Sequence, residues 1–443
     1  MGTMYRIITR DVARGEEVTR RVRLERDTLW LSSADIAALL VGIAVHVVLT
    51  QTFTDGDYGR WVLLLDLFYV TATIVDLGLP TLIGRDGERL GSGTHDLVHR
   101  CLQIQIRFAL PVIAISAILG WLWVGESTTW LVASLILALS ACVQILTYAH
   151  RAALRALGES RQEALVRFVD RGATAIGILL AAWQFGAHPI ALALATFFGP
   201  LGAMVIAIRL GERRLSSADD GIELETSMAK GKQLIDLGLP FLLAAVALVA
   251  NVRIEKLMLG VFSTTDSVEI FQIAWLAFIA GYAPILSVRA VMLSWLGEVR
   301  QDANKMWHRA KRAGVMIGVA SVPGFFIGGW IGVESLVRVF PNYSDEATVV
   351  FTWLLIAWVL ALFASVPLTL VQVSERPLRY AALLWSGIMA DFIACWILIP
   401  DSNNPAEQAA FAAIIGAAVV LIASTVEAKR LHSVTVRSLA AEP

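Results

Sequence analysis

The 443-residue sequence predicts an all-α polytopic membrane protein, with about twelve transmembrane helices in two six-helix bundles around a central cavity. Three observations predict this class: the apolar composition, the long apolar runs, and the position of basic residues on alternate loops. Hydrophobic residues make up 57% of the chain and charged residues 16%, against roughly 45–50% and about 25% in soluble domains. A soluble core could not bury that excess of apolar side chains.

The apolar runs each have about 20 or more residues, which is the length that a helix needs to cross about 30 Å of hydrocarbon. Because unpaired backbone groups cannot face lipid, the runs must be helical. They start near Leu31, Trp61, Cys101, Trp130, Arg167 and His188, and then near Leu237, Ile270, Ala313, Ala347, Leu378 and Gln408. The first run is too long for the core of a signal peptide, so we expect no cleavable signal.

The orientation follows from Lys and Arg, which are retained on the cytoplasmic side of a membrane. One set of alternate loops and the two termini hold 29 of the 36 basic residues, and the opposite loops hold only Arg60 and Arg338. We therefore expect a multi-pass protein of the cell (inner or cytoplasmic) membrane with both termini in the cytoplasm.

A polar connection between the sixth and seventh runs divides the chain. The predicted organisation is a cytoplasmic arm (1–30), a first bundle (31–210), a cytoplasmic linker (211–236), a second bundle (237–430) and a cytoplasmic tail (431–443). The sequence Asp-Leu-Gly-Leu-Pro occurs at 76–80 and at 236–240, but one copy lies late in a span and the other opens a span. The duplicate is therefore no evidence of an internal repeat.

Several classes of partner are not expected. A formal net charge of -1 argues against nucleic acid. Cys101, Cys142 and Cys395 are far apart, no CxxC pattern occurs, and we identify no His pair at metal-ligand spacing. The sequence therefore indicates no disulfide framework, no metal site and no cofactor.

Five basic residues fall inside the apolar runs and are the candidate substrate-binding residues: Arg107, Arg171, Arg253, Lys256 and Arg289. An ionised side chain at mid-bilayer costs at least about 2.5–3.5 kcal/mol, so such residues tend to face a watery cavity or a partner. Two of them, Arg107 and Arg171, lie within about two turns of the cytoplasmic end, where snorkelling to the interface is the alternative.

The pair Arg253 and Lys256 can face one cavity together. Residues three apart on a helix lie about 60° from each other, whereas Glu255 lies about 160° from Arg253. We expect both cations and Arg289 to share a cavity that holds the substrate, with a purely structural pairing of Glu255 as the alternative. Guanidinium groups donate bidentately to phosphate, so a cavity with several cations and few anions favours an anionic substrate.

Acidic residues and one histidine are candidates for coupling to H⁺ or Na⁺. Asp35, Gly42 and His46 lie within about 20° of one helix face, and a carboxylate and an imidazole on one face can form a proton path. A packed, hydrogen-bonding histidine is the alternative. The remaining candidates have no partner that the sequence can name: Asp66, Asp76, Glu255 and Asp391.

Several short motifs carry a resemblance to a known family. Asp57-Tyr58-Gly59 precedes a span that ends in the first Asp-Leu-Gly-Leu copy, and Gly238-Leu239-Pro240 opens the seventh span. The segment 253–260, Arg-Ile-Glu-Lys-Leu-Met-Leu-Gly, has a basic-x-acidic-basic start, and a Ser-Glu-Arg-Pro turn stands at 374–377. In these stretches the chain resembles the polysaccharide (Wzx-type) flippases of the multidrug/oligosaccharidyl-lipid/polysaccharide exporter superfamily. Asp391 stands where these proteins often carry Asn.

The resemblance implies a flippase and no enzyme. Its substrate would be a polyprenyl-diphosphate-linked oligosaccharide, moved to the outer leaflet by alternating access of the two bundles for surface glycan assembly. The implied partners are this anionic lipid-linked oligosaccharide, membrane lipid, H⁺ or Na⁺, and a polysaccharide polymerase and glycosyltransferases.

Three alternatives stay open. A major-facilitator transporter also has six plus six spans, and the segment 84–89, Gly-Arg-Asp-Gly-Glu-Arg, superficially resembles its loop signature. A membrane-embedded glycosyltransferase or polymerase could use Asp55 and Asp57, although the external loops are short. A drug or cation antiporter of the same superfamily is disfavoured, because basic cavity residues would repel cations.

Overall fold

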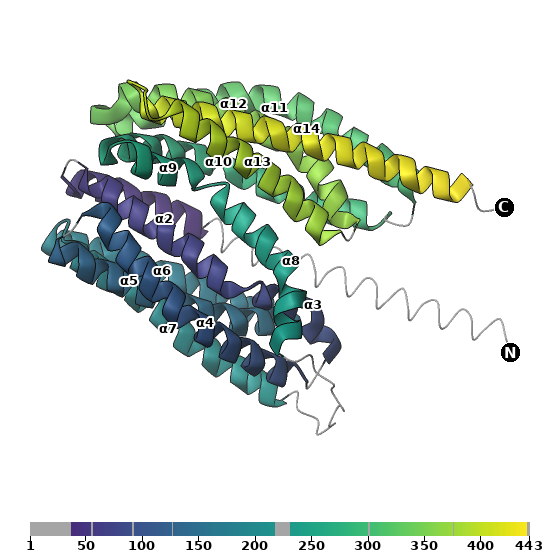
Figure 1. Cartoon of the computed structure of the whole chain (residues 1–443), viewed down its shortest axis with the longest axis horizontal. Helices are drawn as coiled ribbons and strands as arrows, with labels where there is room; N and C mark the ends of the chain where they lie inside the picture. Colours follow the sequence, from purple (N-terminus) through teal and green to yellow (C-terminus); the bar gives the residue numbers. More distant parts are fainter. Residues whose placement is uncertain are drawn as a thin grey trace.

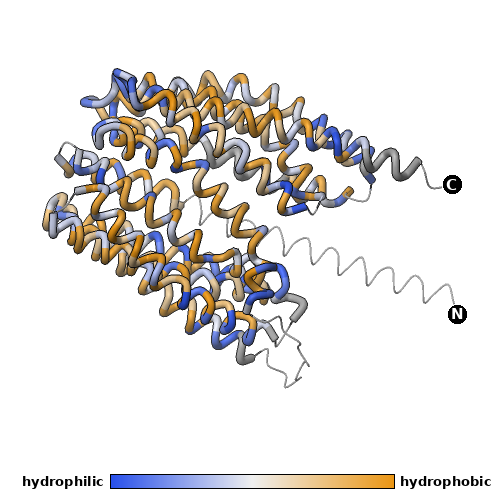
Figure 2. The backbone as a smooth tube through the Cα atoms, in the orientation of Figure 1, coloured by the Kyte–Doolittle hydropathy of each residue, from blue (hydrophilic) through white to orange (hydrophobic). Residues whose placement is uncertain are grey.

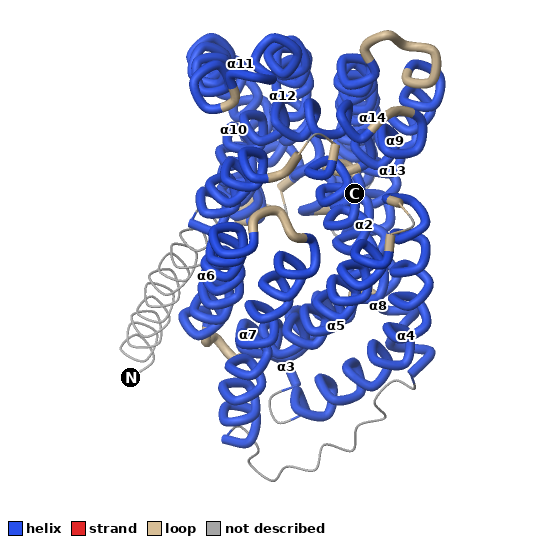
Figure 3. Tube along the Cα trace, turned by 90° about the vertical axis from the view of Figure 1, so that its left-hand side faces the viewer, coloured by secondary structure: helices blue, strands red, loops and turns tan. Residues whose placement is uncertain are grey.

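The structure is entirely helical in the part that it describes. The computed structural model describes residues 37–54, 56–90, 93–125, 127–217, 231–299, 302–374 and 376–440. Within these ranges the helices are joined by short turns and no β-strand occurs (Figure 3). The predicted all-α class is therefore confirmed. Asp35 and the predicted cytoplasmic arm lie outside the described residues.

The first half begins with a helix at Ala37–Thr52, which has no label in Figure 1. It continues with α2 (Asp57–Asp76), α3 (Leu79–Leu90), α4 (Gly93–Val124), α5 (Thr128–Ala156), α6 (Ser160–Phe185) and α7 (Pro189–Ser217). The second half contains α8 (Gly231–Ala250), α9 (Ile254–Phe262), α10 (Thr265–Gly297), α11 (Ala303–Val339), the 3₁₀ turn η1 (Pro341–Tyr343), α12 (Ser344–Val373), α13 (Pro377–Leu398) and α14 (Pro405–Ala440).

The predicted number of crossings agrees with these helices. Among the described residues, nine helices are long and apolar enough to cross a membrane: α2, α4, α5, α7, α8 and α11 to α14. The helix Ala37–Thr52, α6 and α10 coincide with the other three predicted runs. The short helices α3 and α9 follow α2 and α8 after a break in each. Twelve crossings therefore account for the twelve apolar runs.

Helices extend into segments that the sequence assigns to the linker and the tail. Helix α7 continues to Ser217 and α8 begins at Gly231, so both reach into the predicted linker 211–236. Helix α14 continues to Ala440, inside the predicted tail 431–443. Polar sequence at the predicted cytoplasmic side therefore lengthens helices beyond their apolar parts.

Helix ends carry the expected capping residues. The Ser127 hydroxyl accepts a hydrogen bond from the backbone N–H of Trp130 at the start of α5, and Pro377 opens α13. At the start of α11 the Asp302 carboxylate accepts from the backbone N–H of Lys305 at 3.0 Å. This bond to Lys305 holds the pKa of Asp302 below its ordinary value.

The outer surface of the described helices is apolar. Trp183, Val319 and Trp330 are 82%, 71% and 70% exposed. Water-soluble proteins rarely leave such side chains uncovered in continuous surfaces. Hydropathy along the chain shows apolar residues over the middle of the helices and hydrophilic residues mostly toward their ends (Figure 2). Lipid is the environment that this surface fits.

The helices form two bundles with α8 between them (Figure 1). Helix α2 of the first half contacts α8, α9 and α10 of the second half, so it is central to the contact between the bundles. At the predicted external ends the backbones of α2 and α10 approach closely, because a Cβ atom on Gly59 would lie 2.1 Å from the carbonyl oxygen of Thr265. The indole N–H of Trp123 on α4 also donates to the carbonyl of Gly260 on α9 at 2.8 Å.

The two Asp-Leu-Gly-Leu-Pro segments pack against each other. The first forms the break between α2 and α3, where Leu77 and Gly78 have φ of 55° and 68°. A Cβ on Gly78 would lie 2.4 Å from the carbonyl oxygen of Gly238, and a Cβ on Gly238 would lie 2.5 Å from that of Leu77. The duplicate is therefore a contact between the halves, which its sequence positions alone do not indicate.

The segment 84–89, which superficially resembles a major-facilitator loop, is helical and lies within α3. A helix at this position is not the loop that the signature requires. The segment therefore does not support that alternative.

The orientation is testable by labelling. We expect single cysteines at Ser217, near the linker, and at Ser402, between α13 and α14, to react with impermeant maleimides from opposite sides of the membrane. Both basic residues expected outside are neutralised locally, since Arg60 pairs with Asp57 at 2.9 Å and Arg338 with Glu334 at 2.6 Å. The background should lack Cys101, Cys142 and Cys395, and labelling of both sites from one side would contradict the predicted topology.

Candidate functional site

The candidate site is an ion-pair cluster where the two halves meet. Asp66 of α2 lies 3.1 Å, Oδ1 to Nε, from Arg253, and 2.5 Å, Oδ2 to Nζ, from Lys256. One carboxylate of the first half is therefore shared by two cations of the second half. We call Asp66, Arg253 and Lys256 the Asp66 cluster. The sequence predicts that the two cations face one side, and this is confirmed.

A break in the seventh span positions Arg253. Helix α8 ends at Ala250, residues 251–253 form a turn, and α9 begins at Ile254 with Arg253 as its N-terminal flanking residue. The Arg253 side chain donates to the carbonyl oxygen of Val249 at 3.3 Å. The carbonyl groups that the break leaves at the end of α8 thus help to hold the guanidinium.

Aromatic and amide side chains surround the cations. The Lys256 ammonium donates to Gln272 Oε1 at 2.9 Å and lies 4.4 Å from the centre of the Trp275 ring, both on α10. The Arg253 guanidinium lies 4.9 Å from the centre of the Tyr69 ring. Such cation–π contacts partly replace the water that a buried cation loses.

Tyr69 connects a third cation to the cluster. The Arg171 guanidinium of α6 donates to the Tyr69 hydroxyl at 2.9 Å and lies 5.9 Å from the ring centre. Arg171 and Arg253 therefore approach one aromatic ring from different helices of different halves. Of the five predicted substrate-binding residues, the structure brings three together at this point: Arg171, Arg253 and Lys256.

The members of the Asp66 cluster differ in accessibility. The side chain of Arg253 is 18% exposed, that of Asp66 8% and that of Lys256 2%. In addition, Arg253 Nε and Asp66 Oδ2 are buried and make no aligned hydrogen bond, although their ion-pair distances are short. Of the two cations, Arg253 is thus the one that an incoming group can reach. The guanidinium has further N–H groups beside the Nε that faces Asp66, and these can bind a competing anion.

Glu255 faces away from this cluster, as the helical spacing predicts. Its carboxyl group interacts electrostatically with that of Asp391 on α13, and both residues are buried. The Cys395 thiol donates to Asp391 Oδ1 at 3.4 Å. Two like charges at one buried site repel each other, so a proton on either carboxyl group would stabilise the pair.

The remaining coupling candidates have individual partners. His46 Nδ1 lies 2.9 Å from the Tyr58 hydroxyl, and Asp76 accepts a long hydrogen bond of 3.3 Å from the amide of Gln105. The space beside Gly42 is open to 4 Å. His46 therefore makes a hydrogen bond within the first half, which is what the packed-histidine alternative describes.

Two of the predicted cations lie elsewhere. Arg289 donates to the Tyr380 hydroxyl at 2.6 Å, and its position on α10 is roughly 25 Å along the helix from Gln272. A diphosphate is too short to bridge that distance, so the expected direct sharing of one group by Arg253, Lys256 and Arg289 is corrected. Arg107 is exposed on α4 beside Ile106 and Phe108, as a snorkelling arginine would be.

The expectation of few fixed anions near the cations is also corrected. Asp66 neutralises one of the two charges of Arg253 and Lys256, and Asp170 is buried next to Arg171 in the sequence. Asp66 is far from Arg253 and Lys256 in the sequence, so helical periodicity could not assign it as their partner.

A basic cavity at the predicted cytoplasmic side was not expected. It has a volume of about 470 Å³ and lies between α3, α5 and α8, with Arg85, Arg151, Arg155, Tyr148 and Phe241 in its lining. The sequence assigned these arginines to loops on the basis of topology alone. These arginines form a cavity only because α8 packs against the first half. No local sequence pattern predicts that packing.

Part of this basic charge is neutralised. Arg155 donates to Glu163 at 2.9 Å, and Arg167 donates to Glu163 at 2.9 Å from the same helix. Burial alone would raise the pKa of the Glu163 carboxyl, but the hydrogen bonds and charges of Arg155 and Arg167 hold it below its ordinary value. Arg151, which approaches Glu163 only to 3.8 Å, is left as the less neutralised cation of the cavity.

Comparison with known proteins supports one family. A family model described as "Polysaccharide biosynthesis protein" matches residues 48–340. A search of curated proteins finds no match to the chain.

Solved structures with a similar fold are transporters. An inward-facing multidrug resistance MATE family transporter of the MOP superfamily aligns with a TM-score of 0.72 at 13% identity, covering 90% of this chain and 95% of that one. An outward-facing form aligns with 0.68 at 14% identity, covering 92% and 96%. A MOP superfamily transporter from Pyrococcus furiosus, described as having a binding pocket of reverse polarity, aligns with 0.63 at 14%, covering 92% and 95%. These similarities establish the fold.

Proposed function

The chain belongs to the polysaccharide biosynthesis protein family, and from that premise we propose that it is a membrane flippase for a polyprenyl-diphosphate-linked oligosaccharide. The substrate would enter from the cytoplasmic leaflet and leave in the outer leaflet by alternating access of the two bundles. A lipid tail can stay in the bilayer during this movement, so the protein has to shield mainly the charged and sugar parts.

The observation that carries the proposal is the shared carboxylate of the Asp66 cluster. Two cations on one carboxylate leave an excess of positive charge, and Arg253 is the accessible one of the two. A diphosphate offers several oxygens that a guanidinium can bind bidentately. Arg171, held at Tyr69, would supply a second guanidinium for the same group.

The same cluster suggests how binding would be converted into movement. Asp66 belongs to the first half and both cations to the second, so the ion pairs tie the halves together. A diphosphate that takes over Arg253 would compete with Asp66 and weaken this tie. The halves could then separate at their external ends, where Gly59 and Thr265 are in close contact.

A shared proton provides the proposed coupling. Glu255 neighbours Lys256 in α9, and one proton on either Glu255 or Asp391 would remove the repulsion between their buried carboxylates. Loss of that proton would place two like charges together and push α9 away from α13. We therefore favour H⁺ over Na⁺ as the coupling ion, with Glu255 and Asp391 ahead of Asp35 and His46.

The basic cavity beside α8 would serve as the entry site. Arg85, Arg151 and Arg155 lie at the predicted cytoplasmic side, where the diphosphate arrives. Partial neutralisation by Glu163 would keep this binding weak enough for the substrate to move on to Arg253.

The experiment is flipping of a short-chain polyprenyl-diphosphate sugar in proteoliposomes. Arg253→Ala should reduce flipping and binding roughly 10- to 150-fold, because a hydrogen bond to a charged group contributes about 1.5–3 kcal/mol. Arg253→Lys should recover only part of this, since an ammonium lacks the bidentate geometry. Arg107→Ala, which alters an exposed arginine of α4, is the matched control. Wild-type flipping by folded Arg253→Ala protein would refute the assignment.

Export of an organic cation is the second candidate. Its support is the fold similarity to multidrug transporters together with the buried carboxyl pair of Glu255 and Asp391. The accessible group of the Asp66 cluster is a guanidinium, which would repel such a substrate. Transport of a cationic dye that requires Asp391, with no flipping of the diphosphate lipid, would favour this alternative.

A further inference from the structure

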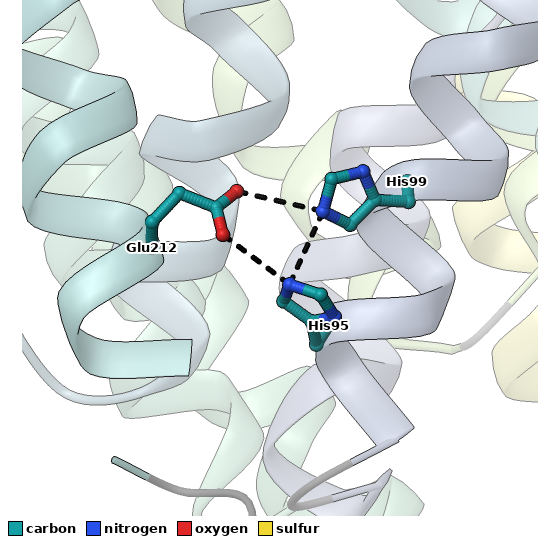
Figure 4. A group of neighbouring side chains, drawn as sticks. All are labelled: His95, His99 and Glu212. Atoms are coloured by element: carbon teal, nitrogen blue, oxygen red, sulfur yellow. Dashed lines mark hydrogen bonds and ion pairs between the residues drawn. The ribbon is translucent and has the colours of Figure 1, made fainter. Parts of the chain in front are cut away.

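Two histidines and a glutamate converge on one point at the predicted cytoplasmic side of the first half (Figure 4). His95 and His99 lie one turn apart at the start of α4, and Glu212 lies near the end of α7. His95 Nε2 is 3.1 Å from His99 Nε2 and 3.2 Å from Glu212 Oε2, and His99 Nε2 is 3.5 Å from Glu212 Oε1. The transport mechanism proposed above makes no use of these residues.

Hydrogen bonds alone cannot satisfy this triangle while Glu212 is ionised. The carboxylate only accepts, so each histidine would need a proton on the Nε2 that faces it. The contact between the two Nε2 atoms, however, allows a proton on only one of them. Whichever tautomers are chosen, one contact joins two acceptors or two donors. A cation between the two imidazoles and the carboxylate would make all three contacts favourable.

The spacing suits a transition metal. Bonds of about 2.0–2.2 Å in a tetrahedral site set the ligand atoms roughly 3.3–3.5 Å apart. The two Nε2 atoms are 3.1 Å apart and lie 3.2 and 3.5 Å from their nearest Glu212 oxygens, which are Oε2 for His95 and Oε1 for His99. Two histidines at i and i+4 on one helix face are a recurring zinc-binding arrangement, and imidazole with carboxylate suits zinc and neighbouring divalent metals. The side chains are 38–48% exposed, so an ion can reach them from solvent.

A third histidine supports the glutamate from the buried side. His150 of α5 is 4% exposed, and its Nδ1 lies 3.1 Å from the carbonyl oxygen of Leu146, which can only accept. In the neutral ring Nδ1 therefore carries the proton, and Nε2, which lies 3.7 Å from Glu212 Oε1, carries the lone pair. A carboxylate that faces this lone pair is repelled by it, and a cation on the opposite side of the carboxylate would stabilise the negative charge. His150 is thus a positioning residue for Glu212.

We propose that His95, His99 and Glu212 bind one divalent transition-metal ion, and that this ion links α4 to α7. Zinc fits the site best. The earlier expectation that the chain has no His pair at metal spacing is wrong, because His95 and His99 are separated by three residues. The expectation rested chiefly on cysteine patterns.

The test uses the full-length chain in detergent, freed of its affinity tag, stripped with a chelator and dialysed against Zn²⁺ or Co²⁺. We expect one metal ion per chain, a Co²⁺ absorption band in the visible region, and a higher melting temperature with Zn²⁺. Glu212→Gln and His99→Gln should weaken binding at least 100-fold and abolish the Co²⁺ band. His150→Gln should weaken binding roughly 10- to 100-fold, the range for residues that orient a ligand.

His308→Ala, which removes another cytoplasmic-side histidine, is the control and should bind as wild type does. Equal melting temperatures of wild type and His99→Gln in chelator would show that the variant folds. Substoichiometric binding by wild type, or binding that survives His99→Gln and Glu212→Gln, would overturn the proposal without affecting the flippase assignment.

Discussion

Asp66→Asn is expected to destabilise the folded protein by about 3–5 kcal/mol, the range for removing one partner of a buried ion pair. The substitution keeps the shape of the side chain but leaves Arg253 and Lys256 without their shared anion. Lys256 is 2% exposed, so water cannot replace the lost charge. Thermal unfolding in detergent, followed by intrinsic tryptophan fluorescence, measures the change.

A second substitution separates charge from packing. Lys256→Met in the Asp66→Asn background should recover most of the lost stability, because replacing a buried ionic group with an apolar one of similar volume is often neutral or stabilising. Asp57→Asn is the matched control, since its partner Arg60 is 40% exposed and such pairs contribute about 0–1 kcal/mol. Similar melting temperatures for Asp66→Asn and Asp57→Asn would show that Asp66 does not neutralise the two cations.

Asp66→Asn should also affect binding and transport in opposite directions. Arg253 would lose its internal competitor, so the diphosphate should bind more tightly. Turnover should fall, because the Asp66→Asn protein has no carboxylate at this position that could pair with Arg253 again after substrate release. The ion pair between the two halves would then not re-form. A structural role alone predicts weaker binding together with slower transport.

The architecture was largely predictable because its signals are local. A span such as α12 is readable from one apolar run. The orientation stays a prediction, which rests on basic residues in short loops. The helix ends were less predictable, since α7, α8 and α14 extend beyond their apolar parts. The break that places Arg253 in a turn between α8 and α9 has no strong signal either, because it contains neither Gly nor Pro.

The candidate site was predictable only within one helix. Periodicity placed Arg253 and Lys256 on one side and Glu255 on the other, and the structure agrees. Their partners, Asp66 and Asp391, come from helices far away in the sequence, so only the tertiary fold selects them. For the same reason Arg289 seemed equivalent to Arg253, although its partner Tyr380 belongs to a different region.

The contact between the twin Asp-Leu-Gly-Leu-Pro segments was not predictable from the sequence for the same reason. Each copy is visible in the sequence, but their contact depends on α8 packing against the α2–α3 break. At that contact small residues allow two backbones to approach, as in other helix contacts within membranes. A Cβ on Gly78 would meet both the carbonyl of Gly238 and, at 2.6 Å, the backbone nitrogen of Leu242.

Gly78→Ala is therefore expected to destabilise the protein by about 2–5 kcal/mol. A left-handed backbone costs a residue with a Cβ roughly 1–2 kcal/mol, and overpacking adds typically 1–3 kcal/mol. Gly238→Ala should cost less, because it meets the backbone of Leu77 but stands inside a helix, where Ala is favoured over Gly by about 1 kcal/mol.

Gly84→Ala separates the loss of this contact from the general effect of replacing a glycine. Gly84 is helical and has no atom within 4 Å of an added Cβ, so the substitution should leave the melting temperature unchanged or raise it. Because Gly84 also lines the basic cavity, it serves as a control for stability and not for flipping. Because Gly78 is also where α8 meets the first half, its replacement should slow flipping in any variant that still folds. If Gly78→Ala melted like Gly84→Ala and flipped like the wild type, then the twin segments would not hold α8 against the first half, and the basic cavity that they border would need another support.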